Sequence, residues 1–539
     1  MDDPFEQQQD VNSDIMDCLM CACSFSVSRA VVVGVRVRCR WQKGKSVETI
    51  IHQRDVVTNR IVRLGEQLRE SGQCTQWFEG ADPTVKHISR DVNGPLCEFV
   101  VAECGYGDKQ VAEVFRKGGP LYGNMPVCGL GPEVAKQAKD SVRKSGRFAA
   151  REKVRIREHR IEDLWNDAER SNMLLADELK SDAFEQEFHT LVSKDAAEGW
   201  MSKPIPFSKD AFQARAVPGL GVQQGFKKDG SVKVRAVYNY SWCAPECGKS
   251  SSYRERKSRS VNGCTWLPEK LSHDHLDDLI NFCRKMVLLL GVVPALFKAD
   301  IASAFRRIPL MPEHVWAAGI MYRHAGRIWT SVHKSCPFGA KASVLNWERV
   351  GRFLCTVARR LLHIAMFEYV DDYFAAENPC VVEHAMQCFA KIVRALLGSS
   401  AIAADKLMFG ASLDILGVNV MLAWDRFAMR PSNEEMKKCL VVINLALAEG
   451  VLRPGCASKL AGRLQWACQY MFHRLGRAMV RPLYAQCQSR NGSVCKDLRI
   501  ALCWWQQVLH MDFVEEKFWK YPEAPLAHLF VDAAGKSSR

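Results

Sequence analysis

The sequence predicts an α+β fold, within the broad α/β class, with a strand-rich middle followed by a helical region. Two apolar runs rich in aromatic and β-branched residues, His363 to Val370 and Tyr373 to Ala376, predict strands joined by a tight turn. Leu413 to Leu422 predicts a second strand pair. Residues 431 to 515 show helical periodicity, and Ser432 with Glu435 forms a capping box at its start.

Composition indicates a large globular protein with a basic surface. The chain has 539 residues, 47% hydrophobic and 25% charged, which is enough for several domains and a sizeable core. Lys and Arg number 74 against 60 Asp and Glu, a formal net charge of +14. Such an excess favours polyanionic partners such as nucleic acid, and charge kept for solubility is the alternative that +14 alone does not exclude.

Cysteine usage and hydropathy indicate a soluble intracellular protein, in the cytoplasm or nucleus. Most of the 22 cysteines sit singly in apolar runs, as reduced buried thiols do. Cys18, Cys21 and Cys23 lack a second pair at zinc spacing, so we interpret that cluster as incidental. No run reaches the ~18 apolar residues of a membrane span. The acidic N-terminus is unlike a secretory signal, so we expect no membrane association and no secretion.

The first 165 residues are expected to form an accessory region of unknown role that ends in charged helices. Ala30 to Trp41 alternates like a strand, and Thr49 to Glu70 has helical spacing. Residues 132 to 180 are rich in Ala, Lys, Arg and Glu, which predicts one or two long helices. A solvated helical linker is the favoured interpretation, with a face for a phosphate backbone as the alternative.

A basic β-hairpin is predicted from Phe226 to Asn239. Asp229-Gly230 is a strong turn signal, and Lys233 and Arg235 lie on one face of the second strand. Such a hairpin can hold a triphosphate, whereas a solvated hairpin is the simpler alternative. The Ser-rich basic segment Lys249 to Ser260 predicts a loop over nucleic acid or a disordered loop.

Two further segments carry chemistry-bearing residues. From Ala295 to Leu310 an apolar strand ends at a single acid, Asp300, which is costly to bury unless it is paired or bound to a metal. Phe305 follows five residues later, as core or as the floor of a nucleotide pocket. Pro337-Phe338-Gly339 precedes a long helix to about Leu361, and its glycine lets the backbone approach a ligand closely.

The adjacent acids Asp371 and Asp372 lie at the predicted turn between the first two strands. Two like charges at one turn repel each other, and a cation that binds oxygen ligands, such as Mg²⁺, relieves the repulsion. An Asp-rich hairpin turn without a metal is the alternative from this window alone.

The order of these segments closely resembles the reverse transcriptase family over roughly residues 200 to 510. Tyr369-Val370-Asp371-Asp372 is among the most specific short signatures of that family. The segment from Asp300 to Leu310 is similar to its first metal-binding motif. Pro337-Phe338-Gly339 resembles the form found in tyrosine-recombinase-type retroelements, whereas retroviral enzymes carry Gln before the Gly, so Phe338 departs from the retroviral pattern.

The resemblance implies a right-hand polymerase fold with an antiparallel palm sheet backed by helices and a helical thumb. The expected domains are the accessory region 1–165, fingers 166–296, palm 297–425, thumb and connection 426–520, and 521–539. The last of these is similar to the first strand of a ribonuclease H domain. Because the chain ends at Arg539, we expect a truncated nuclease without activity.

The resemblance also implies site residues, ions and partners. Phosphoryl transfer from a dNTP uses two divalent ions, Mg²⁺ or alternatively Mn²⁺, roughly 3.5–4 Å apart. Asp300, Asp371 and Asp372 would hold them, with the backbone carbonyl of Ile301. The nucleotide-binding residues would be Lys228 and Arg235 on the phosphates, Phe305 under the sugar, Gly339 over the nucleotide, and Lys406 as proton donor. The expected partners are dNTPs and a primed RNA or DNA template.

Three functions remain open at this point. The first is an active RNA-directed DNA polymerase of a retrotransposon-like element. The second is an RNA-templated RNA polymerase, which Phe305 disfavours because a bulky aromatic residue under the ribose excludes rNTPs. The third is a degenerate, non-catalytic nucleic-acid-binding remnant, which the three intact aspartates disfavour and the truncated nuclease favours.

Overall fold

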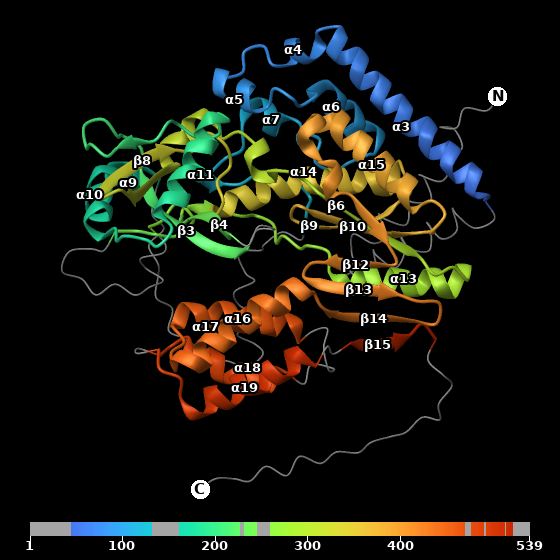
Figure 1. Cartoon of the computed structure of the whole chain (residues 1–539). Helices are drawn as coiled ribbons and strands as arrows, with labels where there is room; N and C mark the ends of the chain where they lie inside the picture. Colours follow the sequence, from blue (N-terminus) through green and yellow to red (C-terminus); the bar gives the residue numbers. More distant parts are fainter. Residues whose placement is uncertain are drawn as a thin grey trace, which may run out of the picture. The chain divides into compact units, whose positions relative to one another are not determined.

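The computed structural model describes residues 45–131, 161–226, 231–244, 259–468, 476–489, 492–511 and 514–520. Within them the chain is a mixed α/β protein with several sheets (Figure 1). It divides into two compact units, residues 1–280 with 296–410, and residues 281–295 with 411–539. The predictions for Ala30–Trp41, for residues 132–160, for Lys228 to Gly230 and for 521–539 lie outside the described residues.

The helices of the first unit confirm the predicted helix at Thr49 to Glu70, which begins at Val47. The Ser46 hydroxyl caps it by accepting a hydrogen bond from the Thr49 N–H. The α-helices of this unit are α3 (Val47–Glu70), α4 (Gln73–Trp77), α5 (Pro83–Ile88), α6 (Gly94–Glu103), α7 (Glu113–Lys117), α9 (Ile161–Asn166), α10 (Ala168–Glu178), α11 (Glu185–Ala197), α14 (Lys341–Arg360) and α15 (Val382–Leu397). A further helix, α13 (Leu276–Leu290), begins in this unit and crosses its boundary.

The central sheet of the first unit has the strand order β11-β6-β10-β9. Its strands are β6 (Ala295–Asp300), β9 (Ala365–Tyr369), β10 (Asp372–Glu377) and β11 (Met408–Gly410). β9 and β10 form the predicted hairpin, and β11 pairs antiparallel with β6. Because β6 lies between β11 and β10, the end of the Asp300 strand adjoins the hairpin that follows it by some seventy residues.

Two amphipathic helices back this sheet, and a third packs on one of them. α14 packs against β9, and α15 packs against β10 and β11. On α15 the buried residues Ala385, Phe389, Ile392 and Leu396 recur at helical spacing, which makes one apolar face. α3 lies along α15, as the neighbouring blue and orange helices in Figure 1 show.

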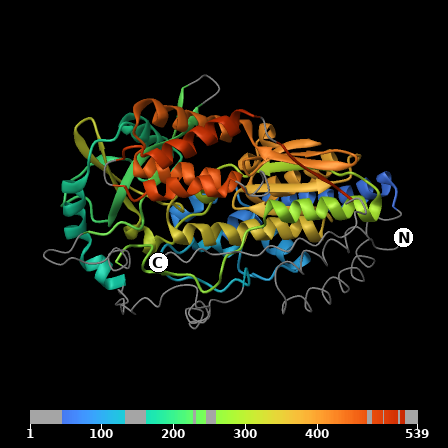
Figure 2. The ribbon, with the colours of Figure 1, turned by 90° about the horizontal axis from the view of Figure 1, so that it is seen from below.

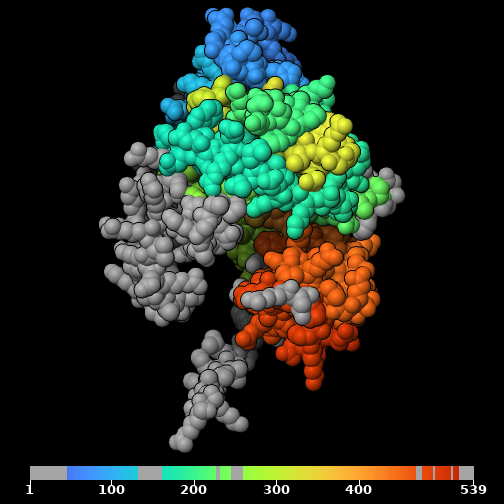
Figure 3. Space-filling view, turned by 90° about the vertical axis from the view of Figure 1, so that its left-hand side faces the viewer, coloured from blue at the N-terminus to red at the C-terminus, as the bar shows by residue number. Residues whose placement is uncertain are grey.

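A second sheet of the first unit has the order β2-β8-β7-β3-β4. Its strands are β2 (Ile205–Pro206), β3 (Ala216–Phe226), β4 (Val232–Tyr238), β7 (Gly319–His324) and β8 (Arg327–Val332). The β3–β4 pair is the predicted basic hairpin, and Lys233 and Arg235 are both on its exposed face. α10 and α11 pack on β3, and Figure 3 shows these teal residues beside the yellow β7–β8 pair. A small parallel pair joins β1 (Gly123–Asn124) to β5 (Thr265–Trp266).

The second unit combines a four-stranded sheet with a helical bundle, orange to red in Figures 1 and 2. Its sheet is β12 (Ser412–Ile415), β13 (Val418–Leu422), β14 (Arg426–Pro431) and β15 (Glu515–Phe518), in that order. The predicted strand pair is therefore confirmed, and its two turn residues, Leu416 and Gly417, both have positive φ, as this hairpin turn requires.

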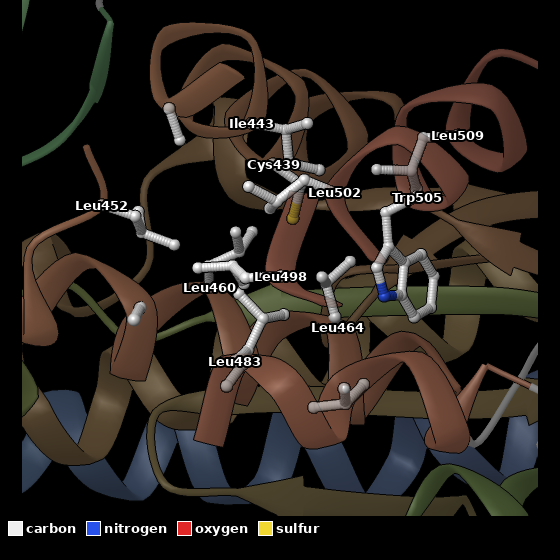
Figure 4. Packing of buried hydrophobic residues seen from close by; sticks show 14 of the residues in the cluster. Cys439, Ile443, Leu452, Leu460, Leu464, Leu483, Leu498, Leu502, Trp505 and Leu509 are labelled. Carbon is white, nitrogen blue, oxygen red and sulfur yellow. The ribbon is translucent and has the colours of Figure 1, made fainter. Parts of the chain in front are cut away.

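The helical prediction for residues 431 to 515 is confirmed over the described residues. The helices are α16 (Asn433–Glu449), α17 (Pro454–Ala467), α18 (Arg477–Gln486) and α19 (Lys496–His510). Ser432 caps α16 by accepting from the Glu435 N–H. Ile443, Leu464, Leu483 and Trp505 meet in one buried core from the four helices (Figure 4). Among the described helices, none combines the length and the apolar character that crossing a bilayer requires.

Candidate active site

The three predicted acids lie where strand β6 ends and where the β9–β10 hairpin turns. Asp300 is the last residue of β6. In the hairpin Asp372 pairs with Tyr369, so Val370 and Asp371 are the two turn residues. The prediction that both acids occupy the turn is wrong for Asp372, which the strand register makes the first residue of β10.

A backbone hydrogen bond joins the two segments that carry these acids. The Ile301 N–H donates to the carbonyl oxygen of Asp371, with 3.2 Å between nitrogen and oxygen. Ile301 directly follows Asp300 and is buried, so this bond fixes the end of β6 to the hairpin turn. The carboxylates of Asp300 and Asp371 therefore come from distant parts of the sequence but share one site.

The turn has a strained backbone that neighbouring groups hold in place. Val370 has φ of 59°, a left-handed conformation that a β-branched residue rarely adopts and that costs about 1–3 kcal/mol. The buried Trp347 of α14 donates its indole N–H to the Val370 carbonyl, at 2.6 Å. This hydrogen bond holds the backbone of the turn, and with it the position of Asp371, in one conformation.

The electrostatics of the site show that the carboxylates are crowded. Loss of solvation on burial, and then the negative charge of Asp300, raise the pKa of Asp371. The positive charges of Arg235 and Lys406 lower it. Loss of solvation, followed by the charges of Asp371 and Asp300, raises the pKa of Asp372 to about 6. Lys406 lies 3.2 Å from a carboxylate oxygen of Asp300, so the predicted proton donor is beside the acids.

These residues fit a divalent cation with oxygen ligands. Burial and then mutual repulsion raise the pKa values of Asp371 and Asp372. A cation between the acids would relieve the repulsion, and carboxylates are the ligands that Mg²⁺ prefers. The carboxylates of Asp300, Asp371 and Asp372 do not all approach within 4.8 Å of one another. The three carboxylates are therefore not all gathered around one point, and their joint role as ligands stays a prediction.

Replacing Asp372 by Asn is expected to stabilise the metal-free protein above pH 6 and to leave it unchanged below pH 4. The folded-state pKa of Asp372, about 6, lies above its ordinary value of 3.8, so the fold disfavours the ionised form. That penalty is absent below the ordinary pKa and complete above the raised one. Water screens this exposed side chain, so the gain is about 1 kcal/mol or less.

Thermal unfolding at several pH values, with EDTA present, tests the Asp372→Asn prediction. Asp210→Asn, an exposed acid away from the site, is the control and should leave the Tm unchanged at every pH. A Tm of Asp372→Asn that equals the wild-type value above pH 6 would show that the fold does not disfavour the ionised form of Asp372.

An aromatic and cationic cluster contains two of the residues predicted to bind a nucleotide, Phe305 and Arg235. Phe305, in the short helix η1 (Ala304–Arg307), contacts Phe338, with ring centroids 5.2 Å apart. The Arg235 guanidinium lies 5.0 Å from the centre of the Phe338 ring, and that of Arg306 lies 5.8 Å away. Because Arg235 also acts on Asp371, the structure brings this part of the predicted set together.

Gly339 has a positive φ of 89°, and a Cβ atom there would overlap the carbonyl oxygen of Tyr238 in β4. The close approach that this glycine permits is therefore to the chain's own strand. Asn262 also donates its side-chain N–H to the Gly339 carbonyl, at 3.0 Å. The role of Gly339 toward a nucleotide stays a prediction.

Gly339→Ala is expected to destabilise the protein by at least about 1–3 kcal/mol, because the new Cβ meets rigid backbone and the left-handed conformation is strained. Urea unfolding measures the loss. Gly326→Ala is the matched control, since Gly326 has a φ of +73° but open space around its Cβ. Equal losses at the two positions would mean that strain alone matters and that the contact with Tyr238 does not.

A buried charge cluster behind the hairpin was missed by the sequence analysis. Glu368 of β9 is completely buried, 3.5 Å from Arg352 of α14. Its N–H donates to Asp274, which pairs with Arg359 at 2.7 Å. Burial, then the charge of Glu348, raises the pKa of Glu368. The signal in the sequence was a glutamate inside an apolar strand, directly before Tyr369.

This cluster fixes β9 to α14 on the side away from the acids. Gly351 of α14 leaves space for the Glu368 carboxylate, because a Cβ atom at this position would overlap it. Arg352 bridges Glu368 and Glu348, and lies 2.9 Å from the latter. The strand that carries the Tyr-Val-Asp-Asp turn thus has charged anchors as well as apolar packing.

Comparisons with known proteins give only distant likenesses. No family model matches the sequence. No curated protein matches it either. Among solved structures, the foamy viral protease-reverse transcriptase dRH in complex with double-stranded DNA is similar at 15% identity and a TM-score of 0.39, covering 62% of this chain and 50% of that one.

The foamy viral protease-reverse transcriptase in complex with an RNA/DNA hybrid is similar at 15% identity and a TM-score of 0.38, covering 61% of this chain and 37% of that one. The chain therefore spans half or less of the length of these two proteins. Likenesses at this level assign no function.

Proposed function

We propose that this chain is an RNA-directed DNA polymerase of a retrotransposon-like element, which adds dNTPs to the 3′ end of a primer. The observation that carries the proposal is the hydrogen bond from Ile301 to Asp371, which brings Asp300 to the Tyr-Val-Asp-Asp turn. Carboxylates converging from two strands of one sheet are what metal-assisted phosphoryl transfer needs. In polymerase terms, residues 166–296 would be fingers, 297–425 palm and 426–520 thumb.

The site residues have distinct roles in this proposal. Asp300 and Asp371 would hold two Mg²⁺ ions, with Asp372 and the Ile301 carbonyl beside them. Bound there, the ions would supply activation of the primer hydroxyl and neutralisation of charge on the phosphates. Arg235, together with Lys228, would bind the β- and γ-phosphates.

Lys406 would serve the leaving pyrophosphate. Its ammonium pairs with Asp300, which places it beside the proposed ion ligands. Lys406 would give a proton to the departing pyrophosphate oxygen.

Phe305→Val is expected to raise incorporation of rNTPs relative to dNTPs by about 10–100-fold, because the smaller side chain leaves room for a 2′-hydroxyl. Phe305 is half-buried against Phe338, so a valine there removes ring area without opening the core. Single-nucleotide incorporation with each class of nucleotide measures the ratio. Phe409→Val, an exposed aromatic residue on β11, is the control. An unaltered ratio in Phe305→Val would show that Phe305 is not the sugar gate.

Primer extension on an RNA template with dNTPs and Mg²⁺ tests the proposal itself. Extension by the full chain, lost when EDTA is added, supports it. Extension with rNTPs in preference to dNTPs would favour an RNA-templated RNA polymerase. Binding of the primed template without extension by either class would favour a non-catalytic remnant, and the proposal would fail.

A further inference from the structure

A second group of ligand-type side chains lies between α3 and α15, on helices that the proposed chemistry does not use. Among the described residues, the one set of three His, Cys, Asp or Glu side chains whose ligand atoms all lie within 4.8 Å is Asp55, His384 and Cys388. Asp55 comes from α3. His384 and Cys388 are one turn apart on α15 and therefore share a face.

The carboxylate of Asp55 and the thiol of Cys388 both lie close to the imidazole of His384. Its Nε2 is 2.9 Å from a carboxylate oxygen of Asp55 and 3.5 Å from the Cys388 sulfur, and the same sulfur is 3.9 Å from Nδ1. A nucleophilic triad needs the acid and the thiol on opposite nitrogens of the imidazole, so that the ring can relay a proton. The Cys388 side chain is also buried, out of reach of a substrate. The arrangement therefore does not suit nucleophilic catalysis.

The distances suit a shared metal ion instead. Zinc bonds of about 2.0–2.3 Å in tetrahedral geometry separate a nitrogen from a sulfur ligand by about 3.5 Å, and from an oxygen ligand by about 3.4 Å. The distance from Nε2 to the sulfur already has this value, but the sulfur is also only 3.9 Å from Nδ1, so the imidazole has to turn before an ion on Nε2 meets the thiolate. The Asp55 oxygen has to move outward by about half an ångström, and its side chain, 41% exposed, has the freedom to do so.

We propose that Asp55, His384 and Cys388 bind one Zn²⁺ ion, with water as the fourth ligand. Imidazole and thiolate together select zinc over Mg²⁺, and a thiolate with a carboxylate neutralises its two charges. Binding releases the thiol proton to solvent, removes the proton that Nε2 of His384 shares with Asp55, and leaves the oxidation states of sulfur and zinc unchanged. The half-exposed Asp55 and His384 give the ion and its water access from outside.

The ion would fasten α3 to α15. Arg54, next to Asp55, already reaches from α3 to Glu377 at the end of β10. A zinc site one residue further along would add a second attachment, to the helix that backs the same strand. It would stabilise the fold without taking part in the proposed polymerisation.

Metal content and cobalt substitution of the purified full chain test the site. We expect zinc bound by the wild type, and a thiolate-to-cobalt charge-transfer absorption when Co²⁺ replaces it. Cys388→Ser should lose that absorption, and the bound zinc should fall by one equivalent. Cys380→Ser, an exposed thiol outside the cluster, is the matched control and should change neither. A variant with Cys18, Cys21 and Cys23 all replaced by Ser should retain the zinc that Cys388→Ser loses.

Asp55→Asn guards against a variant that merely misfolds, because its half-exposed side chain can change without disturbing the core. We expect zinc affinity to fall by at least about 10-fold, since losing even an outer partner of a metal ligand costs that much. Zinc should raise the Tm of the wild type, raise that of Asp55→Asn by less, and leave that of His384→Ala unchanged. Equal zinc content in the wild type and all three site variants would overturn the proposal. So would a wild type that binds no zinc, because the residues would then form only a hydrogen-bonded contact between helices.

Discussion

Asp371→Asn is expected to lower the rate of primer extension about a thousandfold while leaving the protein folded. Asp371 occupies the turn beside Asp300, and both carboxylates would hold the ions that stabilise the transition state. Losing one such ligand costs several kcal/mol of that stabilisation, and each 1.36 kcal/mol is a factor of ten in rate. Single-turnover extension of a primed RNA template measures the change.

The same variant distinguishes a loss of catalysis from a loss of stability. The bond that fixes the turn runs from Ile301 to the backbone carbonyl of Asp371, which Asn retains. Removing the side-chain charge also relieves the repulsion that raises the pKa of Asp371, so the Tm should stay level or rise. Asp210→Asn should extend primers at the wild-type rate. Wild-type activity in Asp371→Asn would remove this residue from the catalytic set.

Arg54→Ala is expected to destabilise the protein by about 3–5 kcal/mol. The Arg54 guanidinium lies 2.5 Å from a carboxylate oxygen of Glu377, both side chains are 1% exposed, and its Nε donates to the Leu362 carbonyl at 2.9 Å. Truncation leaves the Glu377 carboxylate buried without this cation, which is the costly half of breaking a buried ion pair. The midpoint of urea unfolding measures the loss.

A double variant distinguishes the ion pair from packing. Replacing Arg54 by Met and Glu377 by Leu together removes both charges and keeps apolar volume, so most of the stability should return. Arg63→Ala, an exposed arginine on the same helix, should cost less than about 0.5 kcal/mol. If the double variant is as unstable as Arg54→Ala, loss of packing and not an unpaired charge explains the effect.

The elements of the fold could be predicted because local patterns determine them. The helix at Thr49 to Glu70, the hairpin around Val370 and the helices after Ser432 each show periodicity or a cap within one segment. The proximity of Asp300 to Asp371 could not be predicted from local patterns alone. It depends on β6 lying beside β10, and strand order is set by packing of the whole sheet. Resemblance in motif order, and not spacing, suggested it.

The groups that hold the site could not be predicted, since they depend on contacts between distant segments. Glu368 lies 3.5 Å from Arg352 of α14, and Arg54 pairs with Glu377, 323 residues later in the sequence. The strand β4 was predicted, but nothing in the sequence linked it to Gly339, where its Tyr238 carbonyl leaves no room for a Cβ atom. Positive φ at Val370 likewise has no sequence signature, because glycine is the residue that such a turn normally selects.

The long separation between Arg54 and Glu377 has a consequence for how the protein is made. At the usual ~5–20 residues per second of synthesis, the 323 residues between them take about 15–60 s to emerge from the ribosome. Through that interval α3 has no α15 to cover Ile50, Val57 and Ile61, which the finished fold buries. The apolar face of α3 that packs on α15 therefore stays exposed during much of translation. Chaperones that bind apolar segments would have the longest time to bind this one.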